Sequence, residues 1–219
     1  MRRISGFLAI LGMLAAALMV FFYAPIEKTM GIPQKILYFH VSSAWVGGLA
    51  FLVTFVSSIV YLIKRTEGSD RLAASSAELG LVFTTIVLVT GPIWGKVAWG
   101  AWWTWDPPLT TTLILWFMYA AYLVLRSGVG TQAKRVFSAV FGIIAFIDVP
   151  IVFMSIRWWR TIHPVVLTAS GFYREPEMII TLLVSVAAFT LLFVHYLLVK
   201  YDLEDLSSRL DELQTRMGG

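Results

Sequence analysis

This sequence lacks cysteine and has few charged residues. None of its 219 residues is a cysteine, which excludes disulfides, thiol catalysis and thiolate-bound metal within the chain. Only 14% of the residues are charged, whereas a soluble globular domain is about a quarter charged. The composition therefore excludes an ordinary soluble domain.

Hydrophobic residues are abundant instead, at 58% of the chain with a mean hydropathy of +0.79. Six apolar segments are long enough to cross a ~30 Å hydrocarbon core as helices. They are 6–24, 38–63, 76–94, 109–126, 136–156 and 177–199. Because backbone groups in lipid must be paired within a segment, the sequence predicts an all-α polytopic membrane protein. Residues 1–199 form its six-helix domain, and the first segment is interpreted as a retained span, not a cleaved signal.

Basic residues predict the orientation of these spans. The smaller group of six is Lys28, Lys35, Lys96, Arg157, Arg160 and Arg174, and the other eleven of the 17 Lys and Arg residues lie on the opposite side. The positive-inside rule then places both termini in the cytoplasm. The net charge of +4 reflects this topology, and no nucleic-acid partner is expected.

Residues 200–219 differ from the rest of the chain. Leucine and methionine recur there at alternating spacings of three and four, at Leu203, Leu206, Leu210, Leu213 and Met217. This pattern predicts a short cytoplasmic amphipathic helix. Two interpretations stay open: a helix that docks on a partner or pairs with itself, and a surface helix that frays.

The segment 94–109 is the most unusual part of the sequence, and we expect it to form a loop on the outer face. It holds five of the nine tryptophans: Trp94, Trp99, Trp102, Trp103 and Trp105. Tryptophan offers a flat apolar face and one N–H donor. Single tryptophans are common at membrane interfaces, but five within twelve residues favour a large planar ligand. Gly95 and Gly100 allow a backbone to approach such a ligand closely.

Two of the three histidines, His40 and His163, are expected on the same side as these tryptophans, and His195 lies near the inner end of the last span. Imidazole is a good axial ligand of haem iron, and the porphyrin is a flat plate whose anionic propionates need basic partners. Zinc is less suited, since its sites take three or four protein ligands. We interpret His195 as a packing residue. The basic candidates on the outer side include Lys35, Lys96, Arg157 and Arg160.

Two aspartates are harder to assign. Asp106 precedes Pro107 and Pro108, so we expect it to cap the following helix. Asp148 lies inside the fifth span, two residues before Pro150. An intramembrane carboxylate is a candidate for proton relay, or it bonds a neighbouring helix or the groups that Pro150 leaves free.

The motif running from Trp94-Gly95-Lys96 through Trp99-Gly100 to Trp102-Trp103-x-Trp105-Asp106 resembles the tryptophan-rich WWD signature of haem-handling proteins in cytochrome c biogenesis. The number of spans, with one outer histidine before the motif and one after it, resembles the CcmC type best. The resemblance implies that His40 and His163 are the axial ligands of haem b. It also implies that this haem is bound transiently and non-covalently. The five tryptophans and Asp106 match the family's haem-binding platform.

The resemblance also implies partners: the haem chaperone CcmE, the small membrane subunit CcmD, and the ABC-type pair CcmA and CcmB. Family members often carry a basic residue where this chain has Pro108, so Lys35, Lys96, Arg157 or Arg160 would contact the propionates. We therefore expect a multi-pass protein of the bacterial inner membrane that presents haem on its outer face and delivers it to the chaperone. It would be a handling protein, not a conventional enzyme. A haem transport subunit and, ranked lower, a b-type electron-transfer cytochrome are the alternatives.

Overall fold

The computed structural model describes residues 2–28, 30–127, 132–163, 167–168, 171–172 and 175–217. In chain order the elements are α1 (Arg2–Leu18), the π-helix η1 (Met19–Tyr23), the 3-10 helix η2 (Ile32–Lys35), α2 (Ile36–Lys64), α3 (Glu67–Trp99), α4 (Pro107–Arg126), α5 (Gln132–Ala145), α6 (Asp148–Trp158), β1 (Leu167–Thr168), β2 (Gly171–Phe172) and α7 (Pro176–Met217). The two short strands pair antiparallel.

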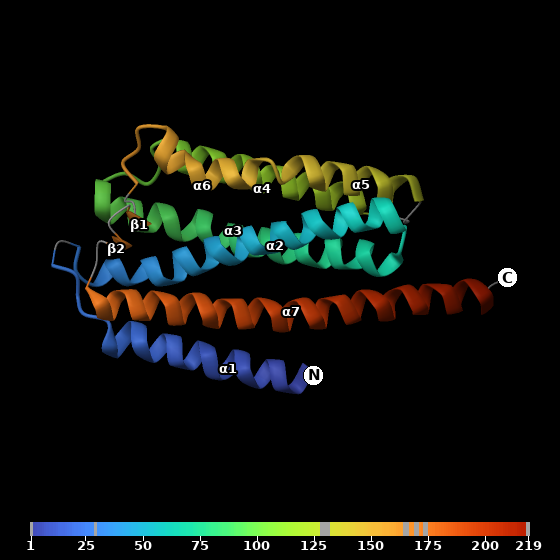
Figure 1. Ribbon diagram of the computed structural model, residues 1–219, viewed down its shortest axis with the longest axis horizontal. Helices are drawn as coiled ribbons and strands as arrows, with labels where there is room; N and C mark the ends of the chain where they lie inside the picture. Colours follow the sequence, from blue (N-terminus) through green and yellow to red (C-terminus); the bar gives the residue numbers. More distant parts are fainter. Residues whose placement is uncertain are drawn as a thin grey trace.

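Six helical segments are long and apolar enough to cross a membrane. They are Arg2–Tyr23, Ile32–Lys64, Glu67–Trp99, Pro107–Arg126, Gln132–Trp158 and Pro176–Ser207. The prediction of a polytopic helical membrane protein with six spans is confirmed. Both termini lie at the same end of the bundle (Figure 1), and which side of the membrane they occupy stays a prediction.

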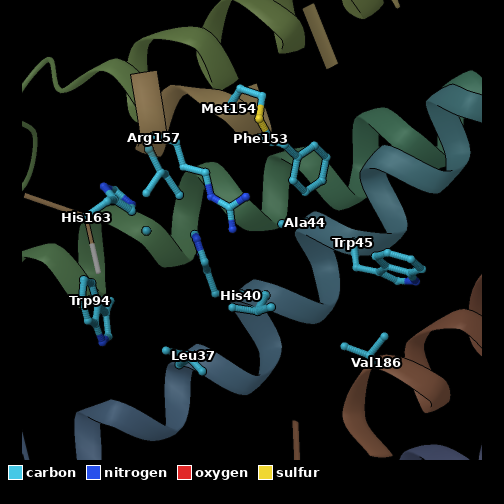
Figure 2. Close-up of a pocket in the computed structure, with 13 residues that line it drawn as sticks. Leu37, His40, Ala44, Trp45, Trp94, Phe153, Met154, Arg157, His163 and Val186 are labelled. Atoms are coloured by element: carbon cyan, nitrogen blue, oxygen red, sulfur yellow. The ribbon is translucent and has the colours of Figure 1, made fainter. Parts of the chain in front are cut away.

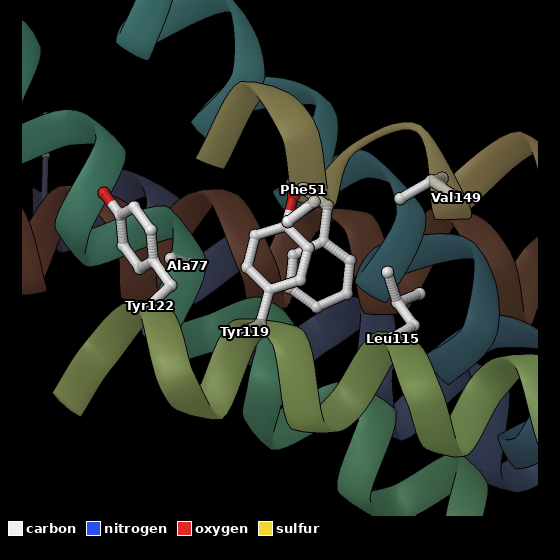
Figure 3. Close-up of a cluster of buried hydrophobic side chains, with 7 residues drawn as sticks. Phe51, Ala77, Leu115, Tyr119, Tyr122 and Val149 are labelled. Carbon is white, nitrogen blue, oxygen red and sulfur yellow. The ribbon is translucent and has the colours of Figure 1, made fainter. Parts of the chain in front are cut away.

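Helices α2 and α3 form a middle layer between α4, α5 and α6 on one side and α7 on the other, and α1 packs on the far side of α7 (Figure 1). The ring of Phe51 on α2 stacks on Tyr119 of α4, with centroids 3.6 Å apart (Figure 3). Gly80 on α3 permits this arrangement, because a Cβ there would lie 2.4 Å from Cε1 of Phe51. This stacked pair packs the middle layer against α4.

The fifth span is interrupted, although the sequence predicted one helix over 136–156. α5 ends at Ala145 and α6 begins at Asp148. Pro150 lies in the first turn of α6, where a missing N–H breaks no helical hydrogen bond. Oδ2 of Asp148 is buried and makes no hydrogen bond within the described residues. A proton relay through Asp148 stays a prediction.

The last span and the tail form one helix, since α7 continues unbroken to Met217. The beginning of the tail is held to α3 by ion pairs, Lys200 to Glu78 at 2.8 Å and Asp205 to Arg71 at 2.5 Å. The tail leucines Leu203, Leu206, Leu210 and Leu213 are all more than half exposed. Whether this helix docks on a partner, pairs with itself or frays stays open.

His195 has the packing role that the sequence favoured. Its Nδ1 lies 3.1 Å from Oγ of Ser5 on α1. A Cβ on Gly6 would lie 3.0 Å from its Cε1, so the ring fills the contact between α1 and α7.

Candidate functional site

The loop that holds the tryptophans is shorter than the predicted loop over 94–109. Trp94–Trp99 form the last turns of α3, and α4 begins at Pro107, so only residues 100–106 connect the two helices. Gly100 ends α3 in the left-handed conformation, with φ +76°, and its N–H donates to the carbonyl of Lys96 at 3.1 Å. A left-handed cap of this kind strongly favours glycine, which explains the role of Gly100 without a ligand.

A cavity of about 400 Å³ lies at the end of the bundle opposite the termini. α2 contributes His40, α3 contributes Trp94, and α6 with the segment after it contributes Arg157 and His163. The other lining residues are Leu37, Val41, Ala44, Trp45, Gly91, Phe153, Met154, Ile156 and Val186. In Figure 2 His40 projects from α2, with Arg157 and His163 across the cavity from it. An apolar pocket with a few converging polar groups is the usual form of a ligand site.

His40 is held by α3. Its Nδ1 lies 2.9 Å from Oγ1 of Thr90, one turn before Trp94. Residues 65–66 join α2 to α3 at the other end of these helices, and the packing of the two helices brings His40 and Thr90 together across 50 positions of sequence.

Asp106 supports His163, and this corrects the expectation that its side chain caps α4. Asp106 occupies the N-cap position, but its carboxylate makes no capping hydrogen bond. Its Oδ2 instead accepts the hydroxyl of Thr161 and lies 3.4 Å from Nδ1 of His163. The Thr161 hydroxyl oxygen also accepts the backbone N–H of His163 at 3.0 Å. Burial lowers the pKa of His163, and the hydrogen bond and charge of Asp106 oppose that shift.

Trp94 and Trp99 pack in sequence against His163 at the cavity. Trp94 is buried and packs edge-on against Trp99, with ring centroids 5.1 Å apart. Trp99 in turn lies 5.0 Å from the ring of His163. Gly95 makes room for this, because a Cβ there would lie 3.1 Å from Cε3 of Trp99. Trp94, Trp99 and His163 therefore form one continuous aromatic group at the cavity.

Of the five motif tryptophans, Trp94 alone lines the cavity, and Trp99 reaches it through its contacts with Trp94 and His163. The five-residue platform stays a prediction. Trp103 packs edge-on against Trp105, at 5.6 Å between centroids. Trp102 and Trp105 are 59% and 70% exposed. Trp105 adopts φ +52°, a conformation that is strained for a bulky residue and is typical of functional sites.

Among the four basic candidates, only Arg157 lines the cavity. Lys35 donates to the carbonyl of Phe21 at 3.0 Å, and Lys96 donates to that of Gly100 at 3.0 Å. These two amines thus bond the ends of neighbouring helical segments. Arg160 is exposed and does not line the cavity. Arg157 is therefore the basic residue that the cavity favours as a propionate partner, and the roles of the other three stay predictions.

Sequence reasoning missed most of the apolar lining and three residues that contact the two histidines: Thr90, Gly91 and Thr161. Thr161 lies two positions before His163, which is a spacing that could have suggested a local contact. Thr90 and Gly91 lie in an apolar helix whose partner histidine is on another span, so only the packing of α2 on α3 identifies them.

Haem is compatible with these residues. Two imidazoles lie on one apolar cavity, Nδ1 of each has a hydrogen-bonding partner within the protein, and Arg157 supplies a cation. A bare metal ion is less compatible, because the described residues contain no cluster of three or more His, Cys, Asp or Glu side chains that could hold one.

Comparison with known proteins identifies the family of this chain. The sequence profile of the family "Heme exporter protein C" matches residues 1–216. The chain is 35% identical over 195 residues to a heme exporter protein C of Bradyrhizobium diazoefficiens, covering 87% of this chain and 74% of that protein. A heme exporter protein C of Rhodobacter capsulatus is 30% identical over 90% of this chain and 83% of its own length.

A putative cytochrome c biosynthesis ccmC-like mitochondrial protein of Marchantia polymorpha is also similar. It is 32% identical over 167 residues, which cover 76% of this chain and 71% of that protein. The family match spans all six helical segments and the whole of the cavity described above. The chain therefore belongs to the heme exporter protein C family.

Proposed function

We propose that this protein binds haem at the His40–His163 cavity, on the outer face of the bacterial inner membrane, and delivers it to a haem chaperone for cytochrome c maturation. The chain belongs to a family of haem-handling membrane proteins. The observation that carries the proposal is that His40 from α2 lines one apolar cavity together with Arg157 and His163 from α6 and the segment after it.

The role of each residue follows from its surroundings. Because Nδ1 of His40 and of His163 face Thr90 and Asp106, Nε2 of each ring is the atom left to bind iron. Metal-binding histidines usually bond their other nitrogen to the protein in this way. Trp94 and Trp99 provide an aromatic wall, and Arg157 pairs with a propionate. The apolar lining from α2, α6 and α7 covers the porphyrin face.

The protein's contribution is binding and orientation, and the haem itself supplies the reactivity toward its acceptor. Trp102 and Trp105 are exposed in the connection between α3 and α4, where an incoming acceptor would contact them. We place the protein in a haem exporter system with an ABC-type pair like CcmA and CcmB. A small subunit like CcmD and an acceptor like CcmE would complete the assembly.

His195 is the residue on which an electron-transfer cytochrome within the bilayer would depend. It is hydrogen-bonded to Ser5 and packed against Gly6, so it is engaged in helix packing. This arrangement favours haem presentation at the other end of the bundle over transmembrane electron transfer.

The experiment is haem co-purification and chaperone loading in His40→Ala, His163→Ala and the double variant. His195→Ala is the matched control, since it removes the third imidazole from the same chain. We expect both quantities to fall in the first three variants and to be retained in the control. Normal haem content and loading in the double variant would contradict the proposal.

A further inference from the structure

We propose that Thr90 is a positioning residue for haem, which holds the imidazole of His40 in the tautomer whose Nε2 is free for iron. The inference rests on the proposed function, because it assigns a task to His40 at the haem site. Nothing in the tryptophan motif identifies Thr90, which precedes that motif on α3 and is brought to His40 only by the packing of two spans.

The hydrogen bonds of Thr90 decide which atom is the donor. Its Oγ1 lies 2.7 Å from the carbonyl oxygen of Ile86 and 2.9 Å from Nδ1 of His40. A carbonyl oxygen can only accept, so the single hydroxyl proton of Thr90 is donated to Ile86. The hydroxyl oxygen must then accept from His40, and Nδ1 carries the proton. In a neutral imidazole this leaves the lone pair on Nε2.

Gly91 determines where the ring lies. A Cβ at this position would be 3.3 Å from Cε1 and 3.9 Å from Nδ1 of His40. The imidazole therefore packs directly against the backbone of α3, and Gly91 shares the cavity lining with it. The hydroxyl of Thr90 and the bare backbone of Gly91 together fix the protonation and the position of the ring before any ligand arrives.

The two histidines thus have different supports. His163 is backed by the carboxylate of Asp106, whereas His40 is backed by a neutral hydroxyl. Loss of a residue that orients a metal ligand typically weakens binding about 10–100-fold. Without the Thr90 hydroxyl the ring of His40 would populate both tautomers, and only one of them presents Nε2 in the form that binds iron.

The test compares four variants of the full-length protein in detergent, titrated with haem. Thr90→Val keeps the shape of the side chain and removes the hydroxyl, Thr90→Ala also removes it without added bulk, and Thr90→Ser restores it. Thr85→Val is the matched control: Thr85 lies on the same helix, donates to Leu81 in the same way and accepts the indole N–H of Trp116 at 2.8 Å, but it does not line the cavity.

The readouts are haem affinity and the spin state of the iron by electron paramagnetic resonance. We expect Thr90→Val and Thr90→Ala to weaken binding at least tenfold and to replace part of the low-spin signal with a high-spin one. Thr90→Ser and Thr85→Val should retain the wild-type spectrum. If Val does not yield folded protein, the Ala and Ser pair alone decides the question.

His40→Ala in the same series separates this inference from the proposed function. Loss of haem in His40→Ala with wild-type spectra in Thr90→Val and Thr90→Ala would overturn the role of Thr90 alone. Retention of normal low-spin haem in His40→Ala would overturn both.

Discussion

Oδ2 of Asp106 lies 3.4 Å from Nδ1 of His163, across 57 positions of sequence. The same carboxylate oxygen accepts the hydroxyl of Thr161, so the entry to α4 and the segment after α6 are joined at one atom. This contact links the end of the tryptophan motif to the second histidine. It gives the aspartate a physical task in orienting an imidazole, in addition to its place at the start of a helix.

Asp106→Asn tests this task. An amide keeps the size of the side chain but removes the charge that favours a donating Nδ1–H, so we expect haem affinity to fall about tenfold or more. Thr161→Val should have a smaller effect, since it leaves the carboxylate facing His163. Haem titration followed by absorption spectroscopy measures both, and equal affinity in Asp106→Asn and wild type would refute the contact's role.

Arg157→Gln should weaken haem binding selectively. Hydrogen bonds to charged groups are worth about 1.5–3 kcal/mol, so we expect at least a tenfold loss of affinity. Arg160→Gln is the matched control, because Arg160 is an exposed arginine of the same part of the chain that does not line the cavity. Equal losses in the two variants would show that general positive charge, and not a contact in the cavity, holds the propionates.

Gly100→Ala should disturb the site through the backbone. A Cβ in the left-handed region costs about 1–2 kcal/mol, and relief of that strain would move the connection 100–106. Gly31→Ala is the control, since Gly31 also has a positive φ of 66° but lies outside the cavity. We expect thermal unfolding to shift downward in both variants and haem affinity to fall only in Gly100→Ala. Unchanged haem affinity in Gly100→Ala would contradict the prediction.

Gly80→Ala tests the packing of the core. The added methyl group would meet the ring of Phe51 at 2.4 Å, and overpacking of this kind typically costs about 1–3 kcal/mol. We expect a lower thermal unfolding temperature with a normal haem spectrum in the folded fraction. A variant as stable as wild type would show that the stacked pair of Phe51 and Tyr119 moves aside without cost.

Much of the fold follows from hydrophobicity alone. Runs of apolar residues predict the six spans, because the bilayer allows few other structures. The helix ends are less predictable. α3 begins at Glu67 and ends at Trp99, well beyond the apolar run 76–94, since polar residues outside the hydrocarbon continue a helix readily. The break after Ala145 depends on a single Pro150 and on packing.

The site was partly predictable from its rare residue types. His40, His163 and Trp94 are rare residues at informative places in the sequence, and the structure brings them to one cavity. Lys35 and Lys96 shared the right side of the bundle, but each amine is bonded to a backbone carbonyl. Side-chain partners depend on contacts between spans, which residue spacing along one chain does not contain. Thr90 and Asp106 owe their roles to such contacts.

The most direct test of the central claim is the identification of the iron's axial ligands by near-infrared magnetic circular dichroism of the haem-loaded protein. The account predicts a bis-imidazole signature in the wild type and in His195→Ala, and its loss in both His40→Ala and His163→Ala. A bis-imidazole signature that persists in the His40→Ala/His163→Ala double variant would contradict it.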